Sequence, residues 1–135
     1  MENVTSIVSG VRGRQAAFVH DSLEGVESLH VVGDIDLANA AEFEAAIMRM
    51  SQFDGPIVID LTCCTFMDSS ALHALLETSK KLKFGVLAAT NSIAHRVFTI
   101  MDASASLAIE YKPFQTIDRN RFGLGPGLPT LKASR

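Results

Sequence analysis

Several features that mark large classes of proteins are missing from this sequence. Its 12 lysine and arginine residues, set against 15 aspartate and glutamate residues, give a formal net charge of −3 and form no cluster. Because nucleic-acid binding depends on a basic patch, we expect no nucleic-acid partner. No apolar run approaches the roughly 20 residues that a membrane-spanning helix needs. The N-terminal residues lack the charged start and apolar segment of a signal peptide, so we expect a cytoplasmic protein without a membrane span.

Cysteine is scarce and occurs only at the adjacent positions Cys63 and Cys64. Neighbouring residues on an extended strand point to opposite faces, so these two thiols are poorly placed to form a disulfide with each other. The same geometry predicts that one thiol packs inward and the other lies near the surface. Two adjacent cysteines offer no further ligands at metal-binding spacing, so we expect a packing role and no metal site.

The motifs of catalysis and of phosphate binding are also missing. Residues 67–71 read MDSSA, without the glycines of the G-x-S-x-G nucleophile motif. His73 lies on the same predicted helix as Ser69, which is a poor position for a general base. His20 and His30 lie in predicted strands, where a structural role is expected. Neither phosphate-binding glycine motif occurs in the body of the chain, so we predict no catalytic residues and no cofactor.

What the sequence does contain is the pattern of one globular α/β domain. Hydrophobic residues make up 47% and charged residues 20% of the 135 residues. Strands are predicted over residues 16–21, 28–36, 56–62, 84–90 and 106–111, and helices over residues 37–52, 69–83 and 91–103. This order predicts a mixed, mostly parallel β-sheet with an N-terminal hairpin and helices packed against it.

The same reading divides the chain into three parts. Residues 1–14 are expected to form a loose arm or a short edge strand, residues 15–122 the domain, and residues 123–135 a flexible tail rich in glycine and proline. At the end of the domain, just before the tail, residues 114–122 are compatible with a short helix.

Apolar spacing assigns an inner face to each helix. The predicted inner residues are Ala40, Phe43, Ile47 and Met50 in the first helix, Leu72, Leu75, Leu76, Ser79 and Leu82 in the second, and Ile93, Val97, Ile100 and Met101 in the third. Asp36 is expected to cap the first helix, and Asn91 or Ser92 the third, because their side chains can accept hydrogen bonds from unpaired amides.

The segment TFMDSSAL, residues 65–72, places an acid and two hydroxyl groups where a strand gives way to a helix. Asp68 can cap the second helix, which leaves Ser69 and Ser70 in its first turn. One capping residue suffices, so the serine pair presents a hydroxyl group at the start of the helix. Such a hydroxyl is a good phosphorylation target, since the modification adds about two negative charges.

Three aspartates are expected at the carboxyl end of the sheet, namely Asp34, Asp36 and Asp68. They could gather as a metal site, but turn formation and helix capping are the favoured interpretation.

Three stretches of this sequence together resemble the STAS domain of bacterial anti-sigma factor antagonists. They are HVVGDIDLANAAEFEAAI, GPIVIDLTCCTFMDSSALHALLETSKKL and GVLAATNSIAHRVFTIMDASASL, and the resemblance covers residues 16–112. The Asp-Ser-Ser element after an apolar strand is its most specific part. The resemblance implies the STAS fold, which agrees with the predicted order of strands and helices.

The resemblance also implies a regulatory cycle. Ser69, or alternatively Ser70, would be phosphorylated by a partner serine kinase that is itself the anti-sigma factor. The unphosphorylated protein would bind this kinase and free the sigma factor, and a phosphatase would restore the phosphorylated protein to the binding form. The expected partner-binding residues are Asp34, Asp36, Asp68, Ser70, Ala71 and His73. The resemblance assigns no oligomeric state.

The sequence departs from the family pattern at one position of this motif. Ala71 stands where most relatives have glycine, a residue that lets another backbone approach closely, so we expect docking with one additional methyl group at this position. An alternative function is a STAS interaction module without a phosphorylation cycle, such as the soluble component of a lipid-transport complex or a stressosome-like scaffold.

Overall fold

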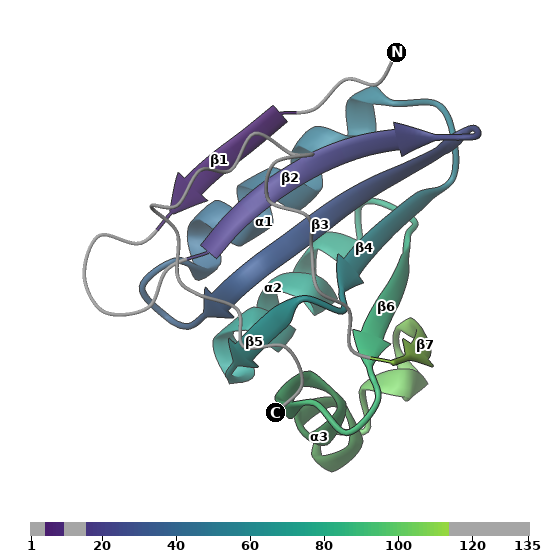
Figure 1. The fold of residues 1–135 in the computed structure, drawn as a ribbon. Coiled ribbons are helices and arrows are strands. Elements are labelled where there is room, and N and C mark those ends of the chain that lie inside the picture. Colours follow the sequence, from purple (N-terminus) through teal and green to yellow (C-terminus); the bar gives the residue numbers. More distant parts are fainter. Residues whose placement is uncertain (1–4, 10–15, 114–135) are drawn as a thin grey trace.

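The computed structural model describes residues 5–9 and 16–113, and these residues form a mixed sheet covered by helices. Its strands are β1 (Thr5–Ser9), β2 (Ala16–Leu23), β3 (Val26–Ile35), β4 (Ile57–Leu61), β5 (Cys64–Met67), β6 (Gly85–Ala89) and β7 (Ala108–Lys112). The order across the sheet is β1-β2-β3-β4-β6-β7, and β5 pairs with the far end of β3 (Figure 1). The pairs β1–β2 and β2–β3 are antiparallel, and the other pairs are parallel. The predicted fold class is confirmed.

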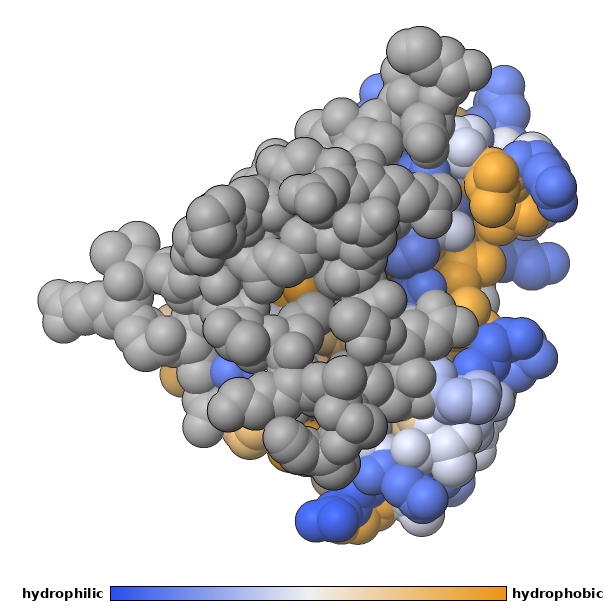
Figure 2. All heavy atoms as spheres, viewed as in Figure 1, coloured by the Kyte–Doolittle hydropathy of each residue, from blue (hydrophilic) through white to orange (hydrophobic). Residues whose placement is uncertain are grey.

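The helices are α1 (Ala40–Arg49), α2 (Ser69–Ser79) and α3 (Ile93–Ile100), with short 3-10 segments η1 (Met50–Gln52) and η2 (Ala103–Ala105). Figure 1 shows α1 and α2 side by side against one face of the sheet, with α3 below β5 and past the C-terminal end of β6. Within the described residues, all helices are too short to cross a membrane. Figure 2 shows the face turned away from α1 and α2, where hydrophobic and hydrophilic side chains of the described residues are mixed.

Alternation along the strands and helical spacing along α1 and α2 place one continuous core between sheet and helices. Val31 on β3 and Ile59 on β4 are fully buried, as are Phe43 on α1 and Leu75 on α2. The ring of Phe43 stacks on that of Phe18, with centroids 5.7 Å apart. This packing fixes how α1 and α2 lie beside each other, and therefore where their first turns meet.

The prediction for the two cysteines was wrong. Cys63 is 6% exposed and Cys64 is 3% exposed, so both lie in the core. The prediction assumed one continuous strand, but Thr62 and Cys63 form a turn between β4 and β5 that reverses the alternation. Burial raises the pKa of the Cys63 thiol to about 11 and that of Cys64 to about 12. Both thiols are therefore protonated at neutral pH and unreactive.

The predicted inner face of α3 was wrong in part: Val97 packs against the core as predicted, but the residues near the end of the helix do not. Ala94 and Phe98 are buried, whereas Ile100 is 73% exposed and Met101 is 55% exposed. α3 has only 8 residues, so a single pair at i and i+4 decides which face packs. The Phe98 ring offers more apolar area than an isoleucine side chain, and its burial turns Ile100 outward. Ser92 caps the helix as predicted, because its hydroxyl oxygen accepts from the His95 backbone N–H at 3.0 Å.

Asp36 does not cap α1. The helix begins later than predicted, at Ala40, and the N-cap position is Asn39, whose side chain makes no capping hydrogen bond. The carboxylate of Asp36 instead accepts from the Ala38 backbone N–H at 2.9 Å, which stabilises a turn between β3 and α1. Residues 114–122, which the sequence analysis found compatible with a short helix, lie outside the described residues.

Candidate functional site at the start of helix α2

Strand pairing brings the predicted acidic residues to one end of the sheet. Ile35 at the end of β3 pairs in parallel with Met67 at the end of β5. Asp36 and Asp68 each follow this pair by one residue, and Asp34 pairs with Phe66 one step before it. The connection to α1 and the first turn of α2 therefore start from neighbouring points.

Each of these aspartates takes part in the local backbone structure. The Asp34 carboxylate accepts a hydrogen bond from the Thr65 hydroxyl, which ties β3 to β5. Asp36 stabilises the turn that leads to α1. Asp68 caps α2 as predicted, and its Oδ1 accepts from the Ser70 N–H at 2.9 Å and from the Ala71 N–H at 3.4 Å. No set of three or more potential metal-ligating side chains occurs among residues 16–113, so the metal interpretation gains no support.

The two serines differ in their exposure. Ser69 is exposed at the first position of α2, whereas Ser70 is half-buried. A hydroxyl group on the outside of the first helical turn can be reached by another protein without local unfolding. Of the two serines, Ser69 is therefore the one whose position suits modification.

A shallow hollow of about 390 Å³ lies beside Ser69, between the start of α1 and the start of α2. Residues from both helices line it, namely Leu37, Ala40, Ala41 and Glu44 on one side and Ser69, Ser70, His73 and Ala74 on the other. Its alanines are small, and Leu37 at its edge is 79% exposed. Leu37 and the alanines together form an apolar surface with polar residues around it, which is the arrangement that marks interaction sites when the patch is contiguous.

Sequence reasoning missed the α1 side of this hollow. Leu37 follows directly after the Gly-Asp-Ile-Asp segment and is an apolar residue off the predicted inner face, and this is the one signal that could have drawn attention to it. Ala40 was predicted as an inner residue, but it is half-buried and borders the hollow.

Two of the predicted partner-binding residues on α2, His73 and Ala71, differ in their exposure. His73 is exposed and lines the hollow, one helical turn after Ser69. Ala71 is 0% exposed, so it offers no surface to a partner. It lies on the inner stripe of α2 with Leu72 and Leu75. The Ala71 methyl group therefore lies in the core, and its effect is on packing.

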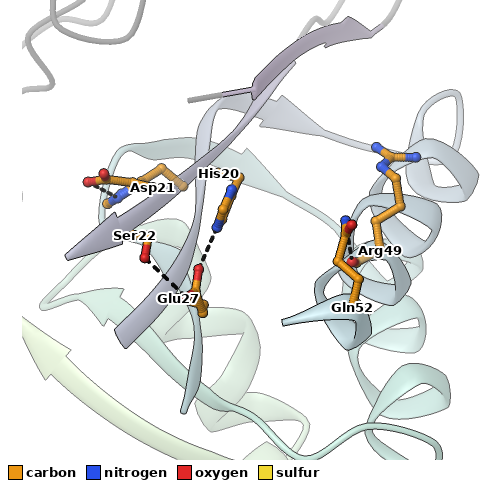
Figure 3. A network of polar contacts seen from close by, with 7 residues as sticks. His20, Asp21, Ser22, Glu27, Arg49 and Gln52 are labelled. Atoms are coloured by element: carbon orange, nitrogen blue, oxygen red, sulfur yellow. Dashed lines mark hydrogen bonds and ion pairs between the residues drawn. The ribbon is translucent and has the colours of Figure 1, made fainter. Parts of the chain in front are cut away.

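A second polar cluster lies on the β2–β3 hairpin (Figure 3). His20 Nε2 lies 2.6 Å from Glu27 Oε1, and the Ser22 hydroxyl donates to Glu27 Oε2 at 3.0 Å. The His20 ring stacks on Phe53 with centroids 4.1 Å apart and is largely buried. A hollow of only about 80 Å³ lies beside it, with Arg49 and Gln52 on α1 and η1 at its lining.

A third contact in the same part of the sheet joins His30 to Asp60, with Nδ1 and Oδ2 separated by 3.1 Å. Burial raises the pKa of Asp60, but hydrogen bonds from His30 and Thr62 outweigh it and hold the pKa below its ordinary value. His20 and His30 therefore have polar partners inside the sheet, as their predicted structural role requires.

The chain is similar to a known protein family and to characterised proteins. Residues 19–119 match the family model described as the STAS domain. The anti-sigma-F factor antagonist RsfB of Mycobacterium tuberculosis strain CDC 1551 / Oshkosh is 40% identical over 83 residues, and the same protein of strain ATCC 25618 / H37Rv matches equally. That match spans 57% of this chain and 66% of RsfB, just under two thirds of its length.

A solved structure shares the fold. The crystal structure of an anti-sigma factor antagonist from Mycobacterium paratuberculosis is 24% identical, with a TM-score of 0.59, and the match covers 90% of this chain and 94% of that chain.

Proposed function

Because the chain belongs to the STAS domain family, we propose that it is an anti-sigma factor antagonist that works by partner switching. In its unmodified form it binds an anti-sigma factor that is also a serine kinase, and this binding releases a sigma factor. The kinase transfers the γ-phosphoryl group of ATP to the hydroxyl oxygen of Ser69, leaving ADP, and the modified protein dissociates. A phosphatase hydrolyses the phosphoserine and restores the binding form.

The observation that carries this proposal is the exposure of Ser69 at the first position of α2. The hydroxyl group stands at the rim of the hollow between α1 and α2, so a kinase that docks there has its target residue inside the contact area. Asp68 supports this placement, because its cap fixes the first turn of α2 and thereby the direction of the Ser69 side chain.

The docking surface of this proposal consists of the hollow and Leu37. An apolar centre surrounded by a polar rim is the usual arrangement of a protein interface. Leu37 serves as the apolar centre, and Ser69, His73 and Glu44 belong to the rim. The contribution of Asp34, Asp36 and Asp68 is indirect. Their hydrogen bonds stabilise the strand ends and turns that position this surface.

Phosphorylation then acts on the interface and leaves the fold intact. A phosphate on Ser69 adds about two negative charges and three oxygen atoms at the rim of the hollow. Against an interface arranged for a neutral hydroxyl group, this charge and bulk cost several kcal/mol. Each 1.4 kcal/mol lowers affinity about tenfold, so a loss of at least about 100-fold is expected.

The test is to incubate the full chain with ATP and its cognate anti-sigma factor and to map the modified residue by mass spectrometry. We expect phosphate on Ser69, no labelling of Ser69→Ala, and normal labelling of the matched control Ser70→Ala. Labelling of another residue overturns the assignment of Ser69. Stable binding to a partner without any labelling favours the alternative of a STAS module without a phosphorylation cycle.

A further inference from the structure

The exposed face of α2 carries ionisable side chains one helical turn apart. His73 follows Ser69 by four residues, Glu77 follows His73 by four, and Lys80 comes three residues later. The Lys80 ammonium group donates to Glu77 Oε2 at 2.9 Å. The hydrogen bond from Lys80 and its charge lower the pKa of Glu77, and the charge of His73 contributes to the same shift. These residues therefore already interact along the helix.

Two backbone N–H groups at the start of α2 already have a side-chain acceptor. Helix N-termini usually stabilise anions through such N–H groups. Here the carboxylate of Asp68 accepts from the N–H groups of Ser70 and Ala71, at 2.9 Å and 3.4 Å. A phosphate on Ser69 therefore competes with Asp68 for these two groups, and a positively charged side chain beside it adds a partner for which Asp68 does not compete.

The hollow beside Ser69 offers one such side chain. Of the described residues that line it, His73 alone can become positively charged. The charged residue that lines the hollow from another element is acidic, namely Glu44 on α1. On α2 itself the neighbour is Glu77, whose carboxylate is shared with Lys80.

We propose that His73 binds the phosphate group of phosphorylated Ser69 and completes a row of alternating charges along α2, an inference that rests on the proposed modification of Ser69. An acidic group four residues N-terminal to a basic one is the favourable orientation on a helix. The phosphate has its second ionisation near about 6. A positive charge on His73 favours the doubly charged phosphate, so the contact lowers the midpoint of that ionisation.

The experiment uses the full chain with phosphoserine introduced at position 69 during translation, so that no kinase is needed. The ³¹P chemical shift of the phosphate is followed from pH 5 to pH 8. We expect the midpoint of its second ionisation to lie about 0.3–0.7 pH units lower in the wild-type chain than in His73→Gln, as for an exposed ion pair.

Two further variants separate a charge contact from a general effect. Lys81→Gln removes one positive charge from the exposed turn after α2, outside the lining of the hollow, and should keep the wild-type midpoint. His73→Lys restores a positive charge at the same place and should keep the midpoint at least as low as in the wild-type chain. Equal midpoints in wild type and His73→Gln, or a high midpoint in His73→Lys, overturn the proposal.

A failure of this proposal can be told apart from a failure of the proposed function. If the kinase assay labels Ser69 but the midpoints are equal, partner switching stands and the His73 contact is wrong. If the midpoints differ but no kinase labels Ser69, the contact exists and the proposed function is wrong.

Discussion

The polar cluster of the β2–β3 hairpin and the start of α2 both concentrate hydroxyl, carboxylate and imidazole groups, but they use them in opposite ways. In the hairpin, His20 and Glu27 face each other at 2.6 Å inside the sheet, with Phe53 stacked on the histidine ring. At the start of α2, Ser69 and His73 are exposed and line an open hollow. The hairpin groups bind one another, whereas the α2 groups are available to a second molecule.

This difference shows how to separate structural from functional polar residues in such a small domain. Burying a polar group without a partner costs free energy, so buried polar groups come in matched sets and stabilise the fold. An exposed hydroxyl group costs the fold almost nothing and contributes almost nothing to it. Mutations in the two regions should therefore change different quantities.

The largest effect on stability is expected for Glu27→Ala. It removes the partner of the buried His20 and of Ser22, and leaving such groups unsatisfied costs about 1–3 kcal/mol of unfolding free energy. Urea denaturation followed by circular dichroism measures this loss. The control Glu110→Ala, at an exposed position of β7, should stay within about 0.5 kcal/mol of wild type. Equal losses in both variants would show that the hairpin cluster does not stabilise the fold.

A somewhat smaller effect is expected for Ala71→Gly, which introduces the residue that the STAS resemblance implies at this position. It removes a fully buried methyl group and adds the cost of glycine in a helix, together about 1–2 kcal/mol of unfolding free energy. Partner affinity should stay within about threefold of wild type, because Ala71 has no exposed surface. A large gain in affinity without a loss of stability would instead place residue 71 in the interface.

A pH-dependent contribution is expected from Asp60. Its pKa in the folded protein lies below the ordinary value of 3.8. The contribution to stability is thus present above that value and is lost as the pH falls through the folded pKa, because protonation breaks the contacts with His30 and Thr62. Thermal unfolding between pH 2 and pH 6 should show a shallower acid-induced decrease for Asp60→Asn than for wild type. An unchanged decrease would assign the acid sensitivity to other groups.

The smallest effect on stability is expected for Ser69→Ala. The side chain is exposed, so the unfolding free energy should change by no more than about 0.5 kcal/mol. The denaturation midpoint measures it alongside Glu27→Ala. A loss comparable with that of Glu27→Ala would mean that Ser69 is a structural residue, and the contrast between the two regions would disappear.

The fold was largely predictable because its local patterns are strong. The positions of β2, β3, β4 and β6 follow from their apolar and β-branched runs, as does the burial of Phe43 and Ile47 on α1 and of Leu72 and Leu75 on α2. Asp68 caps α2 as its position before Ser69 predicts. The errors arose in short segments, where the same apolar spacing is compatible with more than one local structure or packed face. The turn at Thr62 and Cys63 breaks an apolar run that reads as one strand, and α3 is too short for its spacing to decide which face packs.

For the candidate site, the sequence indicated the α2 side and missed the α1 side. The Asp-Ser-Ser motif marked Ser69 directly, whereas Leu37 and Glu44 border the hollow only because α1 packs beside α2. Such a surface depends on tertiary packing and has no local signature. The same limit explains Ala71, whose position next to the serines suggested contact with a partner although its side chain turns into the core. The roles of Ser69 and its neighbours in partner binding stay predictions.

The most direct measurement is the affinity of the full chain for its anti-sigma factor, determined by isothermal titration calorimetry with either serine or phosphoserine at position 69. We expect tight binding of the serine form and at least about 100-fold weaker binding of the phosphoserine form. Equal affinities of the two forms would contradict a switch at Ser69.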